Sequence, residues 1–165
     1  MLRTKTYKFF GVRIGFQSRI YHACEIQNPK KIEIGNKSTI YQHTSLFVGN
    51  KGSFKLGNNS HIAPYGYCLI DNNSLEIGNN VAIGPFTSIF CHSNSPYGPS
   101  AFFTENYIDG DVSIGNNVFI GAHCVILPGT KIHDDVVIAS NSVIKGQIPS
   151  DSIYGGSPAK QIKKL

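Results

Sequence analysis

The 165-residue chain has no tryptophan, one methionine and no apolar run of 18 residues, so a helix that spans a membrane is not expected. Its start lacks the apolar stretch of a signal peptide. The four cysteines form no CxxC pair and are typical of reduced thiols in a cytoplasmic protein. Leucine is scarce, with 7 residues against 21 isoleucines, and this ratio favours strands over a helical bundle.

Positive charge is missing from the middle of the chain. No lysine or arginine occurs between Lys55 and Lys131, although the formal net charge of the whole chain is +5. A protein that binds nucleic acid usually presents a basic stripe with aromatic residues among the charges. Because the basic residues here are confined to the two ends, the sequence argues against nucleic acid as a partner.

Isoleucine and related residues recur every six positions through most of the chain. The spacing is unbroken from Ile114 to Ile144. Shorter runs of three anchors with the same spacing begin at Ile14, Ile34, Leu56 and Ile77. Six is neither a helical period nor plain strand alternation, and it is typical of a short strand, a tight corner and another short strand.

Interruptions of the count fall after every third six-residue unit. The extra residues number 2, 4, 3 and 19, and they follow Ile26, Leu46, Cys68 and Ile89. Three units therefore form one triangular turn, and every insertion leaves from the same corner. This pattern predicts a single all-β domain over residues 1–165, a parallel β-solenoid of about six triangular coils over 14–144 with inward isoleucines.

The segments outside the repeat are predicted to close its ends. Residues 1–12 are assigned to an N-terminal cap. Residues 145–165 are assigned to a C-terminal cap, in which a short basic amphipathic helix runs from Pro158 to Leu165. At the corners, left-handed backbone is expected for the asparagines two residues after an anchor, which are Asn36, Asn58, Asn79 and Asn116.

Three stretches carry a resemblance to a known family. Residues 114–132 (IGNNVFIGAHCVILPGTKI) are similar to the penultimate coils of the hexapeptide-repeat acyltransferases, in particular the maltose, galactoside and xenobiotic acetyltransferase group. Residues 138–165 resemble the ending of that family, and 77–93 resemble the coil that delivers its catalytic histidine. The resemblance implies a left-handed β-helix and a cytoplasmic, acetyl-CoA-dependent O-acetyltransferase acting on a sugar or cell-surface glycan precursor.

The resemblance and the repeat both select His92 as the catalytic base. His92 lies three residues after its anchor, at the corner from which the 19-residue insertion departs, and 93–111 is the expected active-site loop. The family commonly places its histidine two residues further from the anchor. Glu105 and Asp109 are the candidates to orient the imidazole. Cys91 is assigned to packing, since neighbours along a strand face opposite sides.

The coenzyme is expected at a different corner. Ala122 and Ser140 each follow a middle-column anchor by two residues and lie 18 apart, so they should stack. The resemblance assigns coenzyme binding to Phe119, Gly121, Ala122, Ala139, Ser140, Lys145, Lys160 and Lys163. A six-residue strand spans about 20 Å, which separates this groove from His92 within one prism. A homotrimer with sites between subunits is therefore expected.

The acceptor site is expected around Asp71, one coil below His92. Carboxylate, amide and aromatic groups without nearby lysine or arginine favour a neutral or amino sugar. The residues assigned to acceptor binding are Tyr65, Asp71, Asn73, Asn94 and Glu105.

Three alternatives to O-acetylation stay open. N-acylation of an amino sugar is the close one. A carbonic-anhydrase-like protein would need further loop histidines as metal ligands, so no metal is expected. A non-catalytic solenoid would show a regular face of threonines, which is absent.

Overall fold

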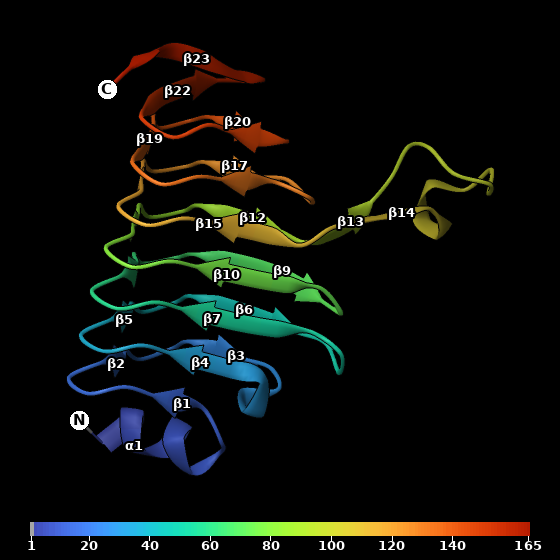
Figure 1. Cartoon of the computed structure of the whole chain (residues 1–165). Coiled ribbons are helices and arrows are strands. Elements are labelled where there is room, and N and C mark those ends of the chain that lie inside the picture. Colours follow the sequence, from blue (N-terminus) through green and yellow to red (C-terminus); the bar gives the residue numbers. More distant parts are fainter. Residues whose placement is uncertain (1) are drawn as a thin grey trace.

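The computed structural model describes residues 2–165, which wind into a stack of triangular coils with one short strand on each side (Figure 1). The first sheet contains β1 (Arg13–Ile14), β4 (Ile32–Ile34), β7 (Ser53–Leu56), β10 (Ser74–Ile77), β15 (Val112–Ile114), β18 (Lys131–Ile132) and β21 (Gln147–Ile148). The second contains β2 (Arg19–Ile20), β5 (Thr39–Ile40), β8 (His61–Ile62), β11 (Ala82–Ile83), β16 (Phe119–Ile120), β19 (Val136–Ile138), β22 (Ser152–Gly156) and β23 (Ala159–Lys164). The third contains β3 (Glu25–Ile26), β6 (Ser45–Val48), β9 (Tyr67–Asp71), β12 (Ser88–Phe90), β17 (Val125–Ile126) and β20 (Val143–Ile144). The predicted β-solenoid is confirmed.

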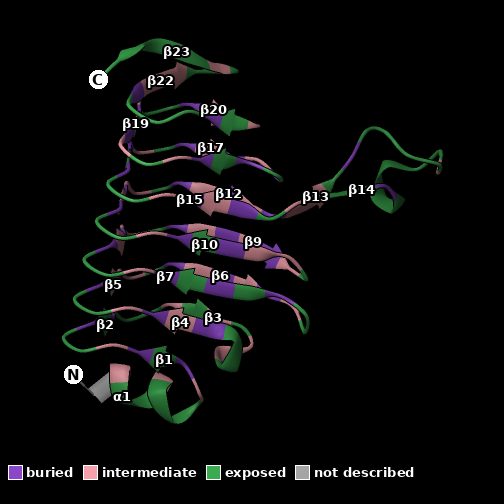
Figure 2. Ribbon diagram, in the orientation of Figure 1, coloured by how far each residue is buried: buried purple, intermediate pink, exposed green. Residues whose placement is uncertain are grey.

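The anchors of successive coils stack into inward columns, visible as buried positions along each strand in Figure 2. In the second sheet Ile83, Ile120 and Ile138 are neighbours in register, and each is at most 1% exposed. A second inward position lies two residues before each anchor. It holds a large apolar residue in the first sheet, such as Phe54, and often a hydroxyl residue before the second-sheet anchors, such as Ser60. The burial of each large apolar side chain stabilises the prism by about 1.5–3 kcal/mol.

The asparagines at the first corner form a ladder. Oδ1 of Asn79 accepts a hydrogen bond from the backbone N–H of Asn58 at 2.8 Å, and Asn36, Asn58 and Asn116 repeat the bond to the coil below. The left-handed angles belong instead to the following residues, for example Asn80 at φ 56°. The predicted left-handed asparagines are therefore wrong by one position, because their amides are needed to satisfy corner N–H groups.

The C-terminal segment is a strand and not the predicted helix from Pro158 to Leu165. β23 folds back antiparallel on β22, with Lys160 opposite Gly155 and Lys163 opposite Ile153. The last strand of an open sheet leaves backbone groups unpaired, and an added strand satisfies them. A helix of eight residues is marginal by itself, so pairing with the sheet edge prevails.

Helix α1 (Leu2–Phe9) closes the opposite end of the prism (Figure 1). The Tyr7 hydroxyl donates a hydrogen bond to the Cys24 carbonyl at 2.9 Å, and Val12 is buried below the helix. A short 3-10 turn, η1 (Pro29–Lys31), connects the first two coils. Of the helices in residues 2–165, none is both long and apolar enough to cross a membrane.

Candidate active site

The 19-residue insertion leaves the prism as an arm of two antiparallel strands, β13 (His92–Asn94) and β14 (Tyr107–Asp109), with the turn η2 (Phe103–Glu105) near its tip (Figure 1). The arm begins and ends at one corner, where the Gly110 N–H donates to the Cys91 carbonyl at 2.9 Å. The coils on either side therefore stay in register, with Ile89 beside Ile126. This geometry fixes His92 at the base of the arm.

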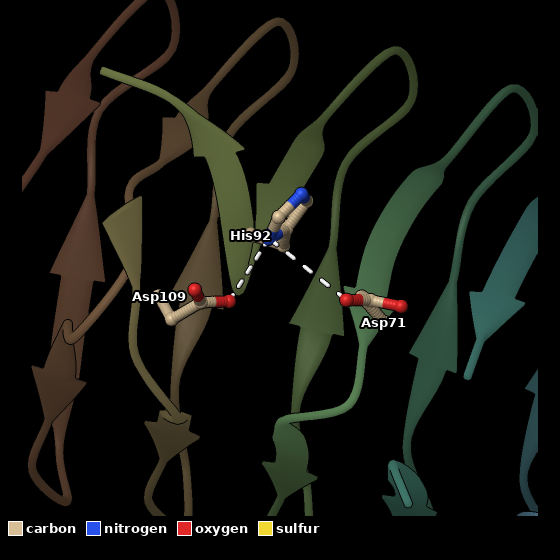
Figure 3. A group of neighbouring side chains, drawn as sticks. All are labelled: Asp71, His92 and Asp109. Carbon is tan, nitrogen blue, oxygen red and sulfur yellow. Dashed lines mark hydrogen bonds and ion pairs between the residues drawn. The ribbon is translucent and has the colours of Figure 1, made fainter. Parts of the chain in front are cut away.

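His92 is paired with a carboxylate of the opposite strand. Its Nδ1 lies 2.9 Å from Oδ1 of Asp109, and its ring stacks on Tyr107 with centroids 5.1 Å apart (Figure 3). A carboxylate only accepts hydrogen bonds, so we assign the proton of the neutral ring to Nδ1. Nε2, which points away from both carboxylates in Figure 3, then carries a free lone pair. This is the tautomer that a general base requires.

Asp109 is itself held in place from the prism. Asn73 Nδ2, predicted to contact the acceptor, donates to Oδ1 of Asp109 at 2.9 Å. Hydrogen bonds from Asn73 and His92 lower the pKa of Asp109 below its usual range. The carboxylate therefore stays ionised at neutral pH, and protonation breaks its interaction with His92 only as the pH falls through that lowered pKa.

Asp71 lies one coil below His92, where the register predicts it. Its Oδ2 is 3.9 Å from Nδ1 of His92, and the residue ends β9 in a left-handed conformation with φ 50°. Asp71, His92 and Asp109 also bring three possible cation ligands within 4.8 Å of one another. The closest ligand atoms of His92 and Asp109 already bond to each other, so the hydrogen-bonded pair accounts for this geometry by itself.

Substituting Asp109 by asparagine is expected to lower kcat by about 10- to 100-fold, the effect of losing one hydrogen bond to a charged group. Asparagine can offer Nδ1 either an oxygen or an NH₂, so the imidazole loses its single tautomer. Nitrogen-15 NMR of the labelled histidines measures that tautomer directly. Glu105→Gln removes a charge from the same arm and should change neither kcat nor the tautomer of His92. If His92 in Asp109→Asn keeps the wild-type tautomer, the assignment is contradicted.

Two predicted acceptor residues have hydrogen bonds within the arm. Glu105 accepts a hydrogen bond from the Ser100 hydroxyl at 2.6 Å, and Asn94 donates to the carbonyl of Phe103 at 3.3 Å. Of the two candidate carboxylates, Asp109 and not Glu105 is thus the one bonded to the imidazole, because it lies directly opposite His92 in the hairpin.

Tyr65 lies on the second corner, away from Asp71 in the same chain. It stacks between His43 and Phe86, with ring centroids 4.9 and 4.8 Å away. Its predicted place beside Asp71 is wrong within one chain, because Tyr65 follows a middle-column anchor and Asp71 follows a third-column one.

Cys91 directly precedes His92 in the sequence, but its side chain is buried in the prism. The side chain is inaccessible to solvent, and burial raises the pKa of its thiol to about 12. A protonated thiol is a poor nucleophile, so the structure agrees with a packing role.

The second sheet carries a wall of small residues along its outer side. A Cβ added to Gly121 would stand 2.5 Å from the Ser140 hydroxyl oxygen, and the Asn141 N–H donates to the Ala122 carbonyl at 3.0 Å. Ala122 and Ser140 therefore lie on the same corner in successive coils, as predicted. Sequence reasoning missed that Gly84 and Gly155 continue the wall, though both occupy the position after a middle-column residue.

Most of the other predicted coenzyme residues lie on or beside the second sheet. Phe119 begins β16 and is half exposed, and Ala139 follows β19 with its Cβ near Gly155. Lys160 and Lys163 are exposed on β23, which pairs with the second sheet. Lys145 follows β20 and lies on the third corner instead.

The chain matches known proteins in sequence and in fold. Residues 111–146 match the family described as bacterial transferase hexapeptide (six repeats). The chain is 32% identical over 117 residues to a galactoside O-acetyltransferase of Escherichia coli, which covers 68% of this chain and 57% of the relative. It is 30% identical over 149 residues to the putative lipopolysaccharide biosynthesis O-acetyl transferase WbbJ of Escherichia coli, covering 86% of this chain and 76% of the relative.

Among solved structures, the chain resembles a variant of AntD, an N-acyltransferase from Bacillus cereus in complex with dTDP-4-amino-4,6-dideoxyglucose and coenzyme A. The TM-score is 0.85 at 25% identity, and the match covers 98% of this chain and 88% of that one. The chain thus spans little more than half of the galactoside enzyme but most of WbbJ and AntD. Its repeat, coil register and sequence relatives together show that it belongs to the hexapeptide-repeat acyltransferase family.

Proposed function

We propose that this protein is an acetyl-CoA-dependent O-acetyltransferase whose acceptor is a sugar or a cell-surface glycan precursor. The observation that carries the proposal is the His92–Asp109 pair, which fixes the imidazole at a corner of a hexapeptide prism in an orientation suited to a base. The names of the sequence relatives support acetyl transfer, and the AntD complexes support a coenzyme A donor. Four free cysteines support a location in the cytoplasm.

The reaction follows from the free lone pair on His92 Nε2. The acceptor hydroxyl gives its proton to Nε2 while its oxygen forms a bond to the thioester carbonyl carbon. The tetrahedral intermediate then collapses, the carbon–sulfur bond breaks, and the leaving thiolate takes the proton from the imidazolium. Asp109 stabilises the positive charge that His92 carries between these steps. Both substrates are bound together, and no acyl-enzyme forms.

N-acylation of an amino sugar is the second candidate. The AntD similarity supports it, and so does the Asp71 carboxylate beside the imidazole, which suits an ammonium group of the acceptor. Product analysis with a matched pair of sugars that differ only in a hydroxyl or an amino group separates the two reactions.

The outer faces of the sheets support assembly into a homotrimer. Outward residues of the first sheet are mostly charged or polar, as at Glu33 and Lys55. The third sheet instead presents mostly half-buried apolar side chains, with Ser45 and Ser88 among them; the apolar ones are Phe47, Tyr67, Leu69, Phe90, Val125 and Val143. An apolar face of this kind suits a second copy, and closed cyclic symmetry brings the third corner of one subunit toward the groove of the next.

We expect light scattering to give the mass of a trimer, with activity lost on dissociation. Phe90→Glu, placed in the third sheet, should yield inactive monomers because it buries a charge in the interface. The same change at Ser113, outward on the first sheet, should leave the trimer intact. A fully active monomer would contradict a site shared between subunits.

Lys160→Ala is expected to weaken acetyl-CoA binding by about 3- to 10-fold at low salt. Lysine attracts the coenzyme phosphates as a point charge, and exposed charges are screened within about 8 Å at physiological ionic strength. The loss measured by calorimetry should therefore shrink as salt rises. Lys51→Ala, an exposed lysine between β6 and β7, is the control; equal Kd values for the wild type and Lys160→Ala at low salt would remove Lys160 from the site.

The direct test is transfer of a labelled acetyl group from acetyl-CoA to a panel of sugars, with thermal shifts read in parallel. Bound coenzyme raises the melting temperature by mass action. Coenzyme-dependent acetylation of one sugar class is the expected result. No stabilisation by any acyl-CoA and no transfer would overturn the proposed function.

A further inference from the structure

The N-terminal end of the prism carries positive charge that acetyl transfer does not use. Residues 1–37 contain eight lysines and arginines against two acids, so their formal charge is +6, while the whole chain has +5. One of the two acids, Glu33, already bonds to Arg13 at 2.7 Å. The other 128 residues together contribute −1, which makes this end the basic pole of the molecule.

A groove of about 1410 Å³ runs between α1 and β2 at this pole. Among the described side chains that line it, none is a carboxylate and four are cationic, which are Lys5, Lys8, Arg19 and Lys37. The phenyl ring of Phe16, 70% exposed, also lines it. Anionic groups of a ligand would be attracted to the groove, and apolar groups would find surface beside the charges.

Two more exposed aromatic residues lie at the end of α1 and directly after it. Phe9 is 86% exposed and Phe10 is 56% exposed, and their rings contact each other edge to face with centroids 5.7 Å apart. The side chain of Lys30 packs against Gly11, the residue after Phe10. Two exposed phenyl rings in contact with each other, next in the chain to Lys8, form an apolar patch of the kind that marks an interaction site.

We propose that the N-terminal end of the prism docks on the surface of an anionic phospholipid bilayer. We define the docking surface as Lys5, Lys8, Phe9, Phe10 and Phe16. The phenyl rings enter the headgroup region, and the lysines contact lipid phosphates, a combination typical of helices that lie in the interface. This proposal does not depend on the reaction or the acceptor.

The arrangement of the rings favours a bilayer over a nucleic acid. Single-stranded nucleic acids bind to aromatic rings whose faces are open along a continuous basic track. Phe9 and Phe10 instead pack on each other edge to face, and neither lines the groove. α1 also lies across the end of the stack and not along its side, so a flat partner can meet it (Figure 1).

Vesicle flotation with the full chain tests the proposal. The protein is expected to float with phosphatidylcholine vesicles that contain 30% phosphatidylglycerol, but not with pure phosphatidylcholine. Lys5→Gln/Lys8→Gln should weaken the apparent affinity by at least about tenfold at physiological salt. Phe9→Ser/Phe10→Ser should have a similar effect that high salt does not abolish. Lys51→Gln/Lys131→Gln removes the same charge from exposed sites elsewhere and should float like the wild type.

Three outcomes would overturn the proposal. The first is no flotation with anionic vesicles. The second is equal loss in the Lys51→Gln/Lys131→Gln control, which would make the attraction a matter of net charge alone. The third is a single-stranded oligonucleotide that binds more tightly than the anionic vesicles and whose binding the Phe9 and Phe10 changes abolish. That result would make nucleic acid the partner. Circular dichroism of each variant checks that the prism is folded.

Discussion

His92→Ala is expected to lower turnover by about 10²–10⁴-fold while the affinity for acetyl-CoA and the melting temperature stay near the wild-type values. The side chain is 24% exposed at the base of the arm. The coils on either side of the arm pair with each other directly, so removal of the imidazole leaves no cavity in the core. What disappears is the Nε2 lone pair that, in the proposed reaction, takes the acceptor proton. Steady-state kinetics with a saturating sugar measures the turnover, and calorimetry measures the affinity for the coenzyme.

Two further variants make this result specific. His133→Ala removes a surface histidine whose ring lies 3.4 Å from Gln147, and it should keep full activity. Cys91→Ala should also remain active, because the buried thiol stays protonated. If Cys91→Ala is folded but dead, transfer passes through the thiol. If His92→Ala stays within a few-fold of the wild type, His92 is not the base.

Ile120→Asn is expected to destabilise the prism by several kcal/mol, enough to unfold or aggregate a domain of this size. The residue is fully buried in β16 between Ile83 and Ile138, so an amide there loses apolar burial and finds no hydrogen-bond partner in the column. Thermal or urea unfolding followed by circular dichroism measures the loss.

The control for this substitution is the neighbouring outward position. Lys131→Asn on β18 faces solvent next to the inward Ile132 and should change the unfolding free energy by less than about 0.5 kcal/mol. A variant at Ile120 that melts like the wild type would contradict the inward column.

The architecture was predictable because one rule is repeated in every coil. A six-residue period fixes which side chains point inward, and the insertions reveal which corner is which, so coil number and register follow without long-range information. The same register predicts that Asp71 lies under His92 and that Ala122 lies beside Ser140. In each case the prediction needs only the count from an anchor.

The parts that were not predictable lie where the repeat ends or is interrupted. Asp109 reaches His92 only because the arm is a hairpin that pairs these two residues, and the sequence of the loop contains no period to indicate this. Pro158 and the lysines after it favour a helix locally, but the open edge of β22 selects a strand. Tyr65 was placed by distance along the chain, whereas the corner it occupies depends on its column.

Because each coil contacts only the coils directly above and below it, slow opening of the molecule should begin at its two ends and advance one coil at a time. Amide hydrogen exchange would then show a gradient, with rapid labelling in β1 and β23 and the strongest protection in the middle coils. β12, which leads into His92, belongs to the fourth coil, remote from both fraying ends. A protease or a brief thermal fluctuation can therefore unfold the termini while the corner that holds His92 keeps its shape.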